Sequence, residues 1–174
     1  MDKRTDLMEI RLQTYLSPCG GLLLGSYADK LCLCDWTAGV RHARVMARVQ
    51  RYLQAPFVEE PSELTRRAAR ELDEFFAKQR QVFDLPLQLA GTDFQQQVWH
   101  NLLKIPYGQT LSYRQTAVLL GMPDAVRAIA NANGANALSI IVPCHRVIGH
   151  NGSLTGYGGG LAAKRFLLDL EKYR

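Results

Sequence analysis

The sequence contains no apolar run long enough for a membrane-spanning helix. Its richest apolar stretches, residues 21–25 and 138–142, fall short of the roughly 18 residues that such a helix needs, because charged and polar residues interrupt them. Residues 1–6 are mostly charged and lack the apolar core of a secretory signal. We therefore expect a cytoplasmic protein that does not contact membranes.

Cysteine is scarce, and the arrangement of the four cysteines does not predict a metal site. Cys32 and Cys34 share one face of an expected strand and Cys19 lies upstream, but no second pair and no suitably spaced histidine accompany them. A chain that stays in the cytosol keeps its thiols reduced. We expect neither a disulfide framework nor a bound metal.

Carboxylates are nearly absent from most of the second half, where Asp124 is the only one between Phe94 and Leu168. The whole chain has a net charge of +5, so this stretch presents little repulsion to a polyanion. Charge alone leaves two interpretations open, a mildly basic protein without a charged partner and a nucleic-acid-binding protein. With 47% hydrophobic residues, the chain can form a substantial core.

The first half predicts an antiparallel sheet followed by helices. Alternating or β-prone residues predict three strands, over residues 10–14, 21–27 and 31–36. Helical periodicity then predicts helices over residues 40–53 and from Ser62 to about Phe76. Proline and glycine follow, so we place a domain boundary near Ala90, between domains 1–90 and 91–174.

One face of the first expected helix carries four arginines, which are Arg41, Arg44, Arg48 and Arg51. A solvated stripe and a binding patch are both compatible with this pattern.

The second half opens with two capping boxes, Thr92 with Gln95 and Ser112 with Gln115, each of which predicts the start of a helix. The second helix should end near Leu120, and Asp124 should cap a third that runs from Ala125 to about Asn133. Two short helices around a glycine-containing turn are typical of a helix-turn-helix, although any helical bundle can produce the same pattern.

Residues 139–142 predict an apolar strand, and residues 161–170 predict a final helix. The glycine-rich loop between them, residues 156–160, lacks the Gly-Lys-Ser/Thr of a phosphate-binding loop. It also lacks a dinucleotide fingerprint, because Leu161 stands at the closing position. It is either a flexible turn or a loop whose backbone approaches a flat ligand.

The segment Pro143-Cys144-His145-Arg146 places a thiol beside a candidate base. A thiol attacks only as its thiolate, so a neighbouring base activates it, and a carboxylate such as Glu171 could orient that base. The alternative is a small buried cysteine at the end of a strand beside a surface histidine, since adjacent side chains on a strand point to opposite faces.

The motifs from Tyr113 to Glu171 resemble, in order and spacing, those of the O6-alkylguanine-DNA alkyltransferases, which repair DNA by direct reversal. The matching segments are 112–115, 125–128, Asn136, 141–149, 156–160 and 164–171. The resemblance implies an α/β (α+β) fold. In it, a ribonuclease-H-like N-terminal domain with a three-stranded antiparallel sheet precedes a mainly helical, winged-helix-like C-terminal domain with a helix-turn-helix.

For DNA, the resemblance implies a monomer, without an obligate protein partner, that binds the duplex through the minor groove. Arg127 would enter the base stack in place of a flipped nucleotide, and Tyr113 would crowd its phosphate. The implied DNA-binding residues are Ser112, Tyr113, Ala125, Arg127, Ala128 and Asn133. Val126 stands where many family members have alanine.

For chemistry, the resemblance implies that Glu171, through His145 and a water, draws the proton from Cys144. The thiolate then takes the alkyl group of O6-alkylguanine, and less readily of O4-alkylthymine, in a single irreversible transfer. The implied substrate-binding residues are Val147, Tyr157, Gly158 and Gly159, and the implied catalytic residues are Cys144, His145, Glu171, Tyr113 and Asn136, the last as a buried hinge. Many relatives have serine where Gly158 stands.

The resemblance implies no cofactor. The zinc of some eukaryotic members would need cysteines near positions 5 and 26, where this chain has Thr5 and Ser26. Three other functions remain open: a lesion-binding relative without transfer, a hydrolase with a Cys-His-Glu triad, and a helix-turn-helix regulator that reads the major groove. The first is disfavoured because such relatives replace the acceptor cysteine.

Overall fold

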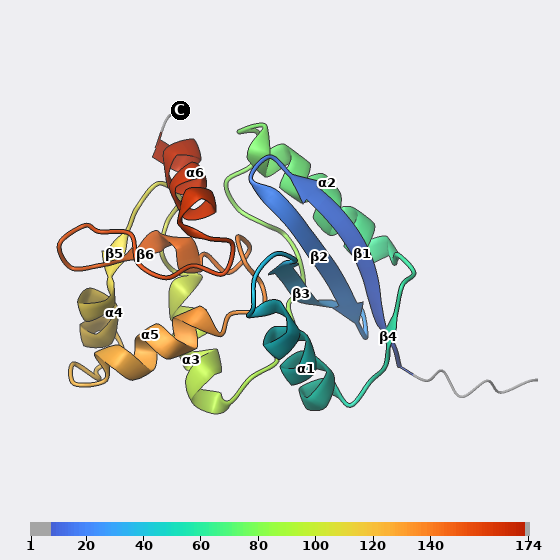
Figure 1. Ribbon diagram of the computed structural model, residues 1–174, viewed down its shortest axis with the longest axis horizontal. Helices are drawn as coiled ribbons and strands as arrows, with labels where there is room; N and C mark the ends of the chain where they lie inside the picture. The colour runs from blue at the N-terminus through green and yellow to red at the C-terminus, as the bar shows by residue number, and fades with distance from the viewer. Residues whose placement is uncertain (1–7, 173–174) are drawn as a thin grey trace, which may run out of the picture.

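The computed structural model describes residues 8–172, so Thr5 and the other terminal residues lie outside the described part (Figure 1). Three strands form the predicted antiparallel meander, and these are β1 (Ile10–Ser17), β2 (Gly20–Tyr27) and β3 (Lys30–Trp36). A fourth strand, β4 (Phe57–Val58), pairs parallel with β1 at the edge, which corrects the predicted count of three. Two residues are too few to show a periodicity, so this strand could not be predicted from the sequence.

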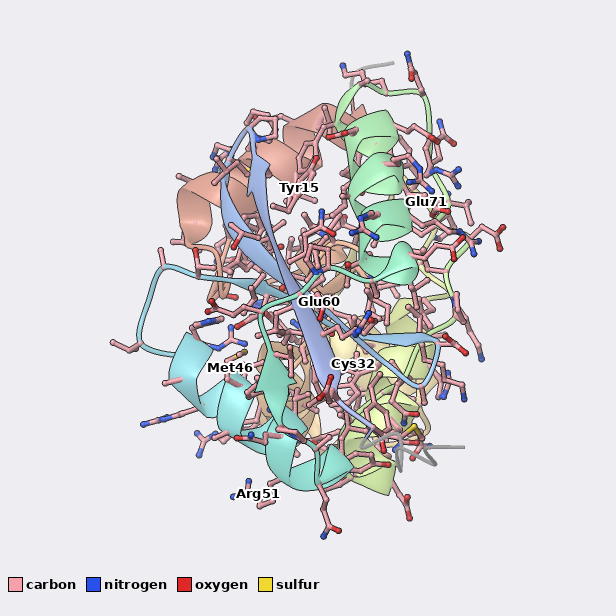
Figure 2. All side chains as sticks on the ribbon, turned by 90° about the vertical axis from the view of Figure 1, so that its right-hand side faces the viewer. Tyr15, Cys32, Met46, Arg51, Glu60 and Glu71 are labelled. Carbon is pink, nitrogen blue, oxygen red and sulfur yellow. The ribbon has the colours of Figure 1, made fainter. Side chains whose placement is uncertain are left out.

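Two helices cover opposite faces of this sheet. Val45 and Val49 of α1 (His42–Leu53) pack with Ile10 and Leu12 in one apolar cluster. Ala68, Leu72 and Phe75 of α2 (Glu63–Phe76) pack with Leu22 and Leu24 in the main cluster. Figure 2 shows the sheet nearly edge-on, with α1, labelled at Met46 and Arg51, on one side and α2, labelled at Glu71, on the other. Both helices were predicted.

A bulge in β3 separates two cysteines that alternation would place together. Leu31 pairs with Ser26 and Leu33 with Gly25, so Cys32 is an extra residue in the ladder. Cys34 therefore belongs to the main cluster and Cys32 to the smaller one. The expectation that the two share a face is wrong, because a bulge shifts the two-residue period.

As far as Lys172, where the described residues end, the second half contributes four α-helices, which are α3 (Asp93–Leu102), α4 (Tyr113–Leu119), α5 (Val126–Gly134) and α6 (Leu161–Lys172). Both predicted capping boxes form, with Thr92 and Ser112 as the N-caps. Asp124 does not cap α5; the N-cap is Ala125, which has no side-chain cap bond. Asp124 lies one residue too early in the turn that Gly121 opens with φ +69°.

The predicted strand over residues 139–142 is wrong. These residues form a buried turn, in which the Val142 amide donates to the Leu138 carbonyl and Ile140 has φ +72°. Leu138, just before this turn, forms an isolated parallel bridge with Cys34 of β3. A short apolar run indicates burial, but it does not distinguish a strand from a turn that is enclosed on every side.

Two short strands, β5 (Leu111–Ser112) and β6 (Val147–Ile148), pair in parallel, and β6 directly follows a 3-10 turn at Cys144–Arg146. The mixed α/β class is as predicted. In Figure 1 the helices α3 to α6 lie beside the sheet, and the main cluster joins both halves of the chain. Within residues 8–172, no helix combines the length and apolar character needed to cross a bilayer.

Candidate active site

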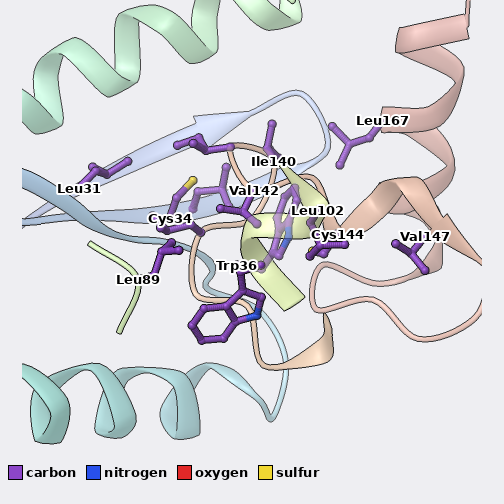
Figure 3. Packing of buried hydrophobic residues seen from close by; sticks show 14 of the residues in the cluster. Leu31, Cys34, Trp36, Leu89, Leu102, Ile140, Val142, Cys144, Val147 and Leu167 are labelled. Atoms are coloured by element: carbon purple, nitrogen blue, oxygen red, sulfur yellow. The ribbon is translucent and has the colours of Figure 1, made fainter. Parts of the chain in front are cut away.

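Cys144 lies inside the main apolar cluster rather than on a strand. Figure 3 shows it beside Leu102 of α3 and Val142, between the side chains of β3 and Leu167 of α6. Only 5% of the residue is exposed. Burial raises the pKa of its thiol, and it outweighs the opposing Asn136 hydrogen bond and the charges of Arg41 and Lys164. The thiol therefore needs a base to become a nucleophile at neutral pH.

Two asparagines tie the end of α5 to the segment that carries Cys144. The Asn136 amide donates to the Val142 carbonyl at 2.9 Å, and its side-chain oxygen accepts from the Leu138 amide at 2.9 Å. Asn133 Nδ2 donates to the Cys144 carbonyl at 3.5 Å. These bonds fix the backbone on both sides of the thiol, relative to α5.

Behind Cys144, the carboxylate of Glu171 contacts two buried side chains, the imidazole of His145 and the guanidinium of Arg146. His145 Nε2 lies 2.8 Å from Glu171 Oε1, and Arg146 donates through Nε and Nη2 at 2.7–3.1 Å. The Gly108 amide adds a longer bond of 3.3 Å. A two-pronged arginine contact fixes the plane of the carboxylate, and the carboxylate then fixes the imidazole.

The charges of this network determine which histidine nitrogen is free. Burial favours the neutral acid of Glu171, but the bonds and charges of His145 and Arg146 prevail and lower its pKa to about 2. Burial lowers the pKa of His145 more than Glu171 raises it, so the imidazole is neutral at pH 7. An ionised carboxylate only accepts, so we assign the proton to Nε2. Nδ1 is left as a base, and no group among the described residues bonds to it.

Lys164 is a buried cation that sequence reasoning did not single out. It is fully buried on α6, where its ammonium donates to the Val147 carbonyl at 2.7 Å and to the Thr155 carbonyl at 3.0 Å. It thereby ties the Cys144 segment to the start of the glycine loop. A carbonyl has two lone pairs, so Val147 can still accept from a ligand.

An open cavity of about 780 Å³ lies between the start of α4, the helix α5 and residues 155–157, and it collects several predicted residues. Tyr113, Arg127, Asn133 and Tyr157 line it together with Arg41. Burial raises the pKa of the Tyr113 phenol, and hydrogen bonds with Thr155 and Asn133 oppose that shift. The phenol therefore stays a donor at neutral pH.

The remaining predicted DNA-contact residues do not line this cavity. Ser112 caps α4 through the Gln115 amide, Ala125 is the N-cap of α5, and Ala128 is exposed on α5. Arg127 is also exposed. The structure thus groups Tyr113, Arg127, Asn133 and Tyr157 and leaves the other three on the adjoining helix starts and surface.

The predicted substrate-binding glycines pack on residues from the first half. A Cβ atom built on Gly158 would lie 2.7 Å from Arg41 Nη1, and one built on Gly159 would lie 2.6 Å from the Trp36 ring. Trp36 also contacts Tyr157 edge-on, with ring centroids 5.8 Å apart. The loop is therefore held against the first half and not left as a flexible turn.

The arginine stripe divides into two pairs. Arg41 and Arg48 donate to the carbonyls of Gly134 and Ala135 at the end of α5, whereas Arg44 and Arg51 are exposed. Cations stabilise the carbonyl end of a helix. The sequence pattern showed the shared face but could not show that a helix end lies opposite half of it.

Comparisons with known proteins point to one family. Residues 93–173 match the family described as 6-O-methylguanine DNA methyltransferase, DNA binding domain. The chain is 42% identical to the methylated-DNA--protein-cysteine methyltransferase of Methanosarcina barkeri over 90% of its own length and 93% of the relative. The protein of the same name from Mycobacterium bovis is 57% identical over 62% of this chain, and the match spans 65% of that relative.

Among solved structures, the Mycobacterium tuberculosis OGT in complex with DNA is 42% identical, with a TM-score of 0.79 over 93% of this chain and 92% of that chain. The O6-methylguanine-DNA methyltransferase from Pyrococcus kodakaraensis has a TM-score of 0.67 at 20% identity over 93% of this chain and 98% of that chain, which indicates a shared fold alone. The buried Cys144, its histidine–carboxylate pair and these matches place the chain in the family of methylated-DNA--protein-cysteine methyltransferases.

Proposed function

We propose that this protein repairs DNA by direct reversal, transferring the alkyl group of O6-alkylguanine, and less readily of O4-alkylthymine, to Cys144. The observation that carries the proposal is the buried His145–Glu171–Arg146 network directly after Cys144 in the 3-10 turn. It supplies a neutral imidazole with a free Nδ1 on the residue that directly follows Cys144, whose thiol has a raised pKa. The names of the family members support the same reaction.

The proposed step conserves atoms and charge. Nδ1 of His145 accepts the Cys144 proton through one water, and the imidazolium that forms is stabilised by Glu171. The thiolate attacks the alkyl carbon, so an S–C bond forms while the C–O6 bond breaks and its electron pair moves to the guanine. Donors at the Tyr113 hydroxyl and the Gly158 amide stabilise that negative charge. Nothing in this mechanism cleaves the thioether, so each molecule acts once.

We further propose that the damaged nucleotide leaves the duplex and enters the cavity lined by Tyr113, Asn133 and Tyr157. Arg127 is exposed on α5, and its planar guanidinium can stack in the space that the nucleotide vacates. Flipping costs about a few kcal/mol, which contacts of this kind must offset. Small residues at Ala125 and Ala128 let α5 approach the minor groove closely, and the scarcity of carboxylates from Phe94 to Leu168 favours a polyanion.

Intact mass measurement tests the transfer. The protein is incubated with excess O6-benzylguanine, or with duplex DNA containing O6-methylguanine, and the adduct is located by peptide mapping. We expect one alkyl group per chain on Cys144, no increase with longer incubation, and no adduct in Cys144→Ala. Continued turnover would instead support the cysteine hydrolase, and tight lesion binding without an adduct would support a binding-only relative.

A comparison of two substrates tests nucleotide flipping. Arg127→Ala should slow repair of O6-methylguanine in duplex DNA by about five- to 150-fold, because the stacking contact is worth about 1–3 kcal/mol. The reaction with the free base should stay within about twofold. Arg114→Ala, an exposed arginine on α4, serves as the matched control. Equal losses on both substrates would exclude a flipping role for Arg127.

A further inference from the structure

Arg41, in the first half of the chain, lies at the wall of the pocket proposed to hold the alkylated base. It is the N-cap residue of α1, and its guanidinium donates to the Gly134 carbonyl at the end of α5. This bond crosses from the first half to the second. It fixes a long side chain whose free rotation would otherwise leave its position undefined.

The same guanidinium covers Gly158. A Cβ atom at position 158 would lie 2.7 Å from Nη1 and 3.3 Å from Cζ of Arg41, so a side chain there and the present position of Arg41 exclude each other. The neighbouring Gly159 differs, because its contact is the buried indole of Trp36, which is only 3% exposed. Arg41 is half-buried and could be displaced, but only by giving up its bond to Gly134.

Arg41 also faces the reaction site. It lines the cavity that contains Tyr113, Arg127 and Tyr157, and its positive charge acts on Cys144. We propose that Arg41 is a specificity-determining residue: its guanidinium occupies the space of a side chain at position 158 and limits the size of the O6 substituent that the pocket admits. This inference rests on the proposed alkyl transfer. It assigns to the first half of the chain a direct part in substrate selection.

The proposal predicts that positions 41 and 158 are coupled. Gly158→Ser should slow alkylation of Cys144 by O6-benzylguanine about tenfold, because the serine displaces the guanidinium from Gly134 and into the pocket. In an Arg41→Ala background the same serine should change the rate by less than about twofold, since the space is then empty. Rates are measured by intact mass for the parent, both single variants and the double variant.

The proposal also predicts a change of selectivity. Arg41→Ala should raise the rate with O6-benzylguanine relative to that with free O6-methylguanine by about fivefold, because truncation widens the pocket. Arg41→Lys should do the same, since an ammonium lacks the planar surface that covers Gly158. Arg44→Ala, exposed three residues further along the same helix, should leave both rates unchanged. A merely structural role would lower both rates together and leave their ratio unchanged.

The role of Arg41 and the proposed alkyl transfer are contradicted by different results. If the serine costs the same factor with and without Arg41, or if the benzyl-to-methyl ratio does not change, the role of Arg41 is wrong while alkyl transfer stands. If the parent protein forms no adduct on Cys144, the proposed function fails and the inference fails with it. Thermal unfolding of each variant shows whether a rate loss comes from a loss of folded protein.

Discussion

At the scale of single residues, Glu171 is the group on which the buried charges of the site converge. Its carboxylate accepts from His145, Arg146 and the Gly108 amide, and its side chain is only 1% exposed. Removal of one partner from a buried charged network leaves the other charges buried and unpaired. The resulting loss of stability is larger than the stability that the intact network provides relative to apolar side chains. Glu171 therefore couples the stability of the site to its reactivity.

Glu171→Gln should affect both properties. It leaves the Arg146 charge without a counterion, so the free energy of unfolding should fall by about 3 kcal/mol. It also replaces the ionised acceptor of the His145 Nε2 proton with a neutral amide, which stabilises the imidazolium less, so alkylation of Cys144 by O6-benzylguanine should slow by at least about a hundredfold. Urea unfolding and intact mass kinetics measure the two effects. Asp169→Asn, on the exposed side of the same helix, is the matched control and should change neither.

The same carboxylate predicts how stability depends on pH. Its pKa is lowered from 4.5 to about 2 in the folded state, so it stabilises the fold fully above pH 4.5. That stabilisation, about 3 kcal/mol, should be lost as the pH falls from 4.5 toward 2. Urea unfolding at a series of pH values checks this expectation. A parent and a Glu171→Gln variant with equally steep losses over this range would show that another group is responsible.

At the scale of elements, the glycine loop is defined by what it packs against. Gly159→Ala would place a Cβ atom 2.6 Å from the indole of Trp36, which is buried in the main cluster and cannot move aside. Overpacking of this kind costs about 1–3 kcal/mol, and it should displace the loop and slow alkylation of Cys144. Gly134→Ala is the contrast, since no atom beyond its chain neighbours and its own helix backbone lies within 4 Å of the added Cβ and the residue is helical. It should stabilise the fold by about 0.5–1 kcal/mol, as thermal unfolding would show.

The elements differ in how far the sequence predicts them. The capping boxes at Thr92 and Ser112 predict their helices correctly, because the reciprocal bonds are local and need no tertiary partner. The turn at 139–142 was predicted as a strand, because its conformation depends on bonds to Asn136 and to the sheet. The bulge at Cys32 and the strand β4 likewise depend on pairing that periodicity does not record.

The residues of the site also divide into those that the sequence predicts and those that only the fold identifies. Cys144, His145 and Glu171 were proposed together from the sequence, and the structure brings the His145 imidazole and the Glu171 carboxylate within 2.8 Å. Three further cations complete the surroundings of Cys144. Arg146 pairs with the Glu171 carboxylate, which is distant in sequence, whereas Lys164 and Arg41 donate to backbone carbonyls. A backbone carbonyl has no sequence signature, so only the fold could identify the last two.

At the scale of the whole molecule, the boundary expected near Ala90 coincides with packed residues. Leu89 belongs to the main cluster and Ala90 to the smaller one, and both are buried. The main cluster also joins Trp36 of the sheet to Trp99 of α3. A linker between independent domains is typically exposed and crossed by few contacts. We therefore expect the two halves to unfold together, even though the motifs divide between them.

Tryptophan fluorescence tests this expectation, because each half contains one buried tryptophan. Trp99→Phe leaves Trp36 as the reporter of the first half, and Trp36→Phe leaves Trp99 as the reporter of the second. In each variant, the urea midpoint of the fluorescence should coincide with that of far-UV circular dichroism, which follows the whole chain. Separate midpoints in either variant would show that the halves are independent units. Their shared core would then be a docked interface, and the contacts of Arg41 and Trp36 with the glycine loop could be lost without unfolding the second half.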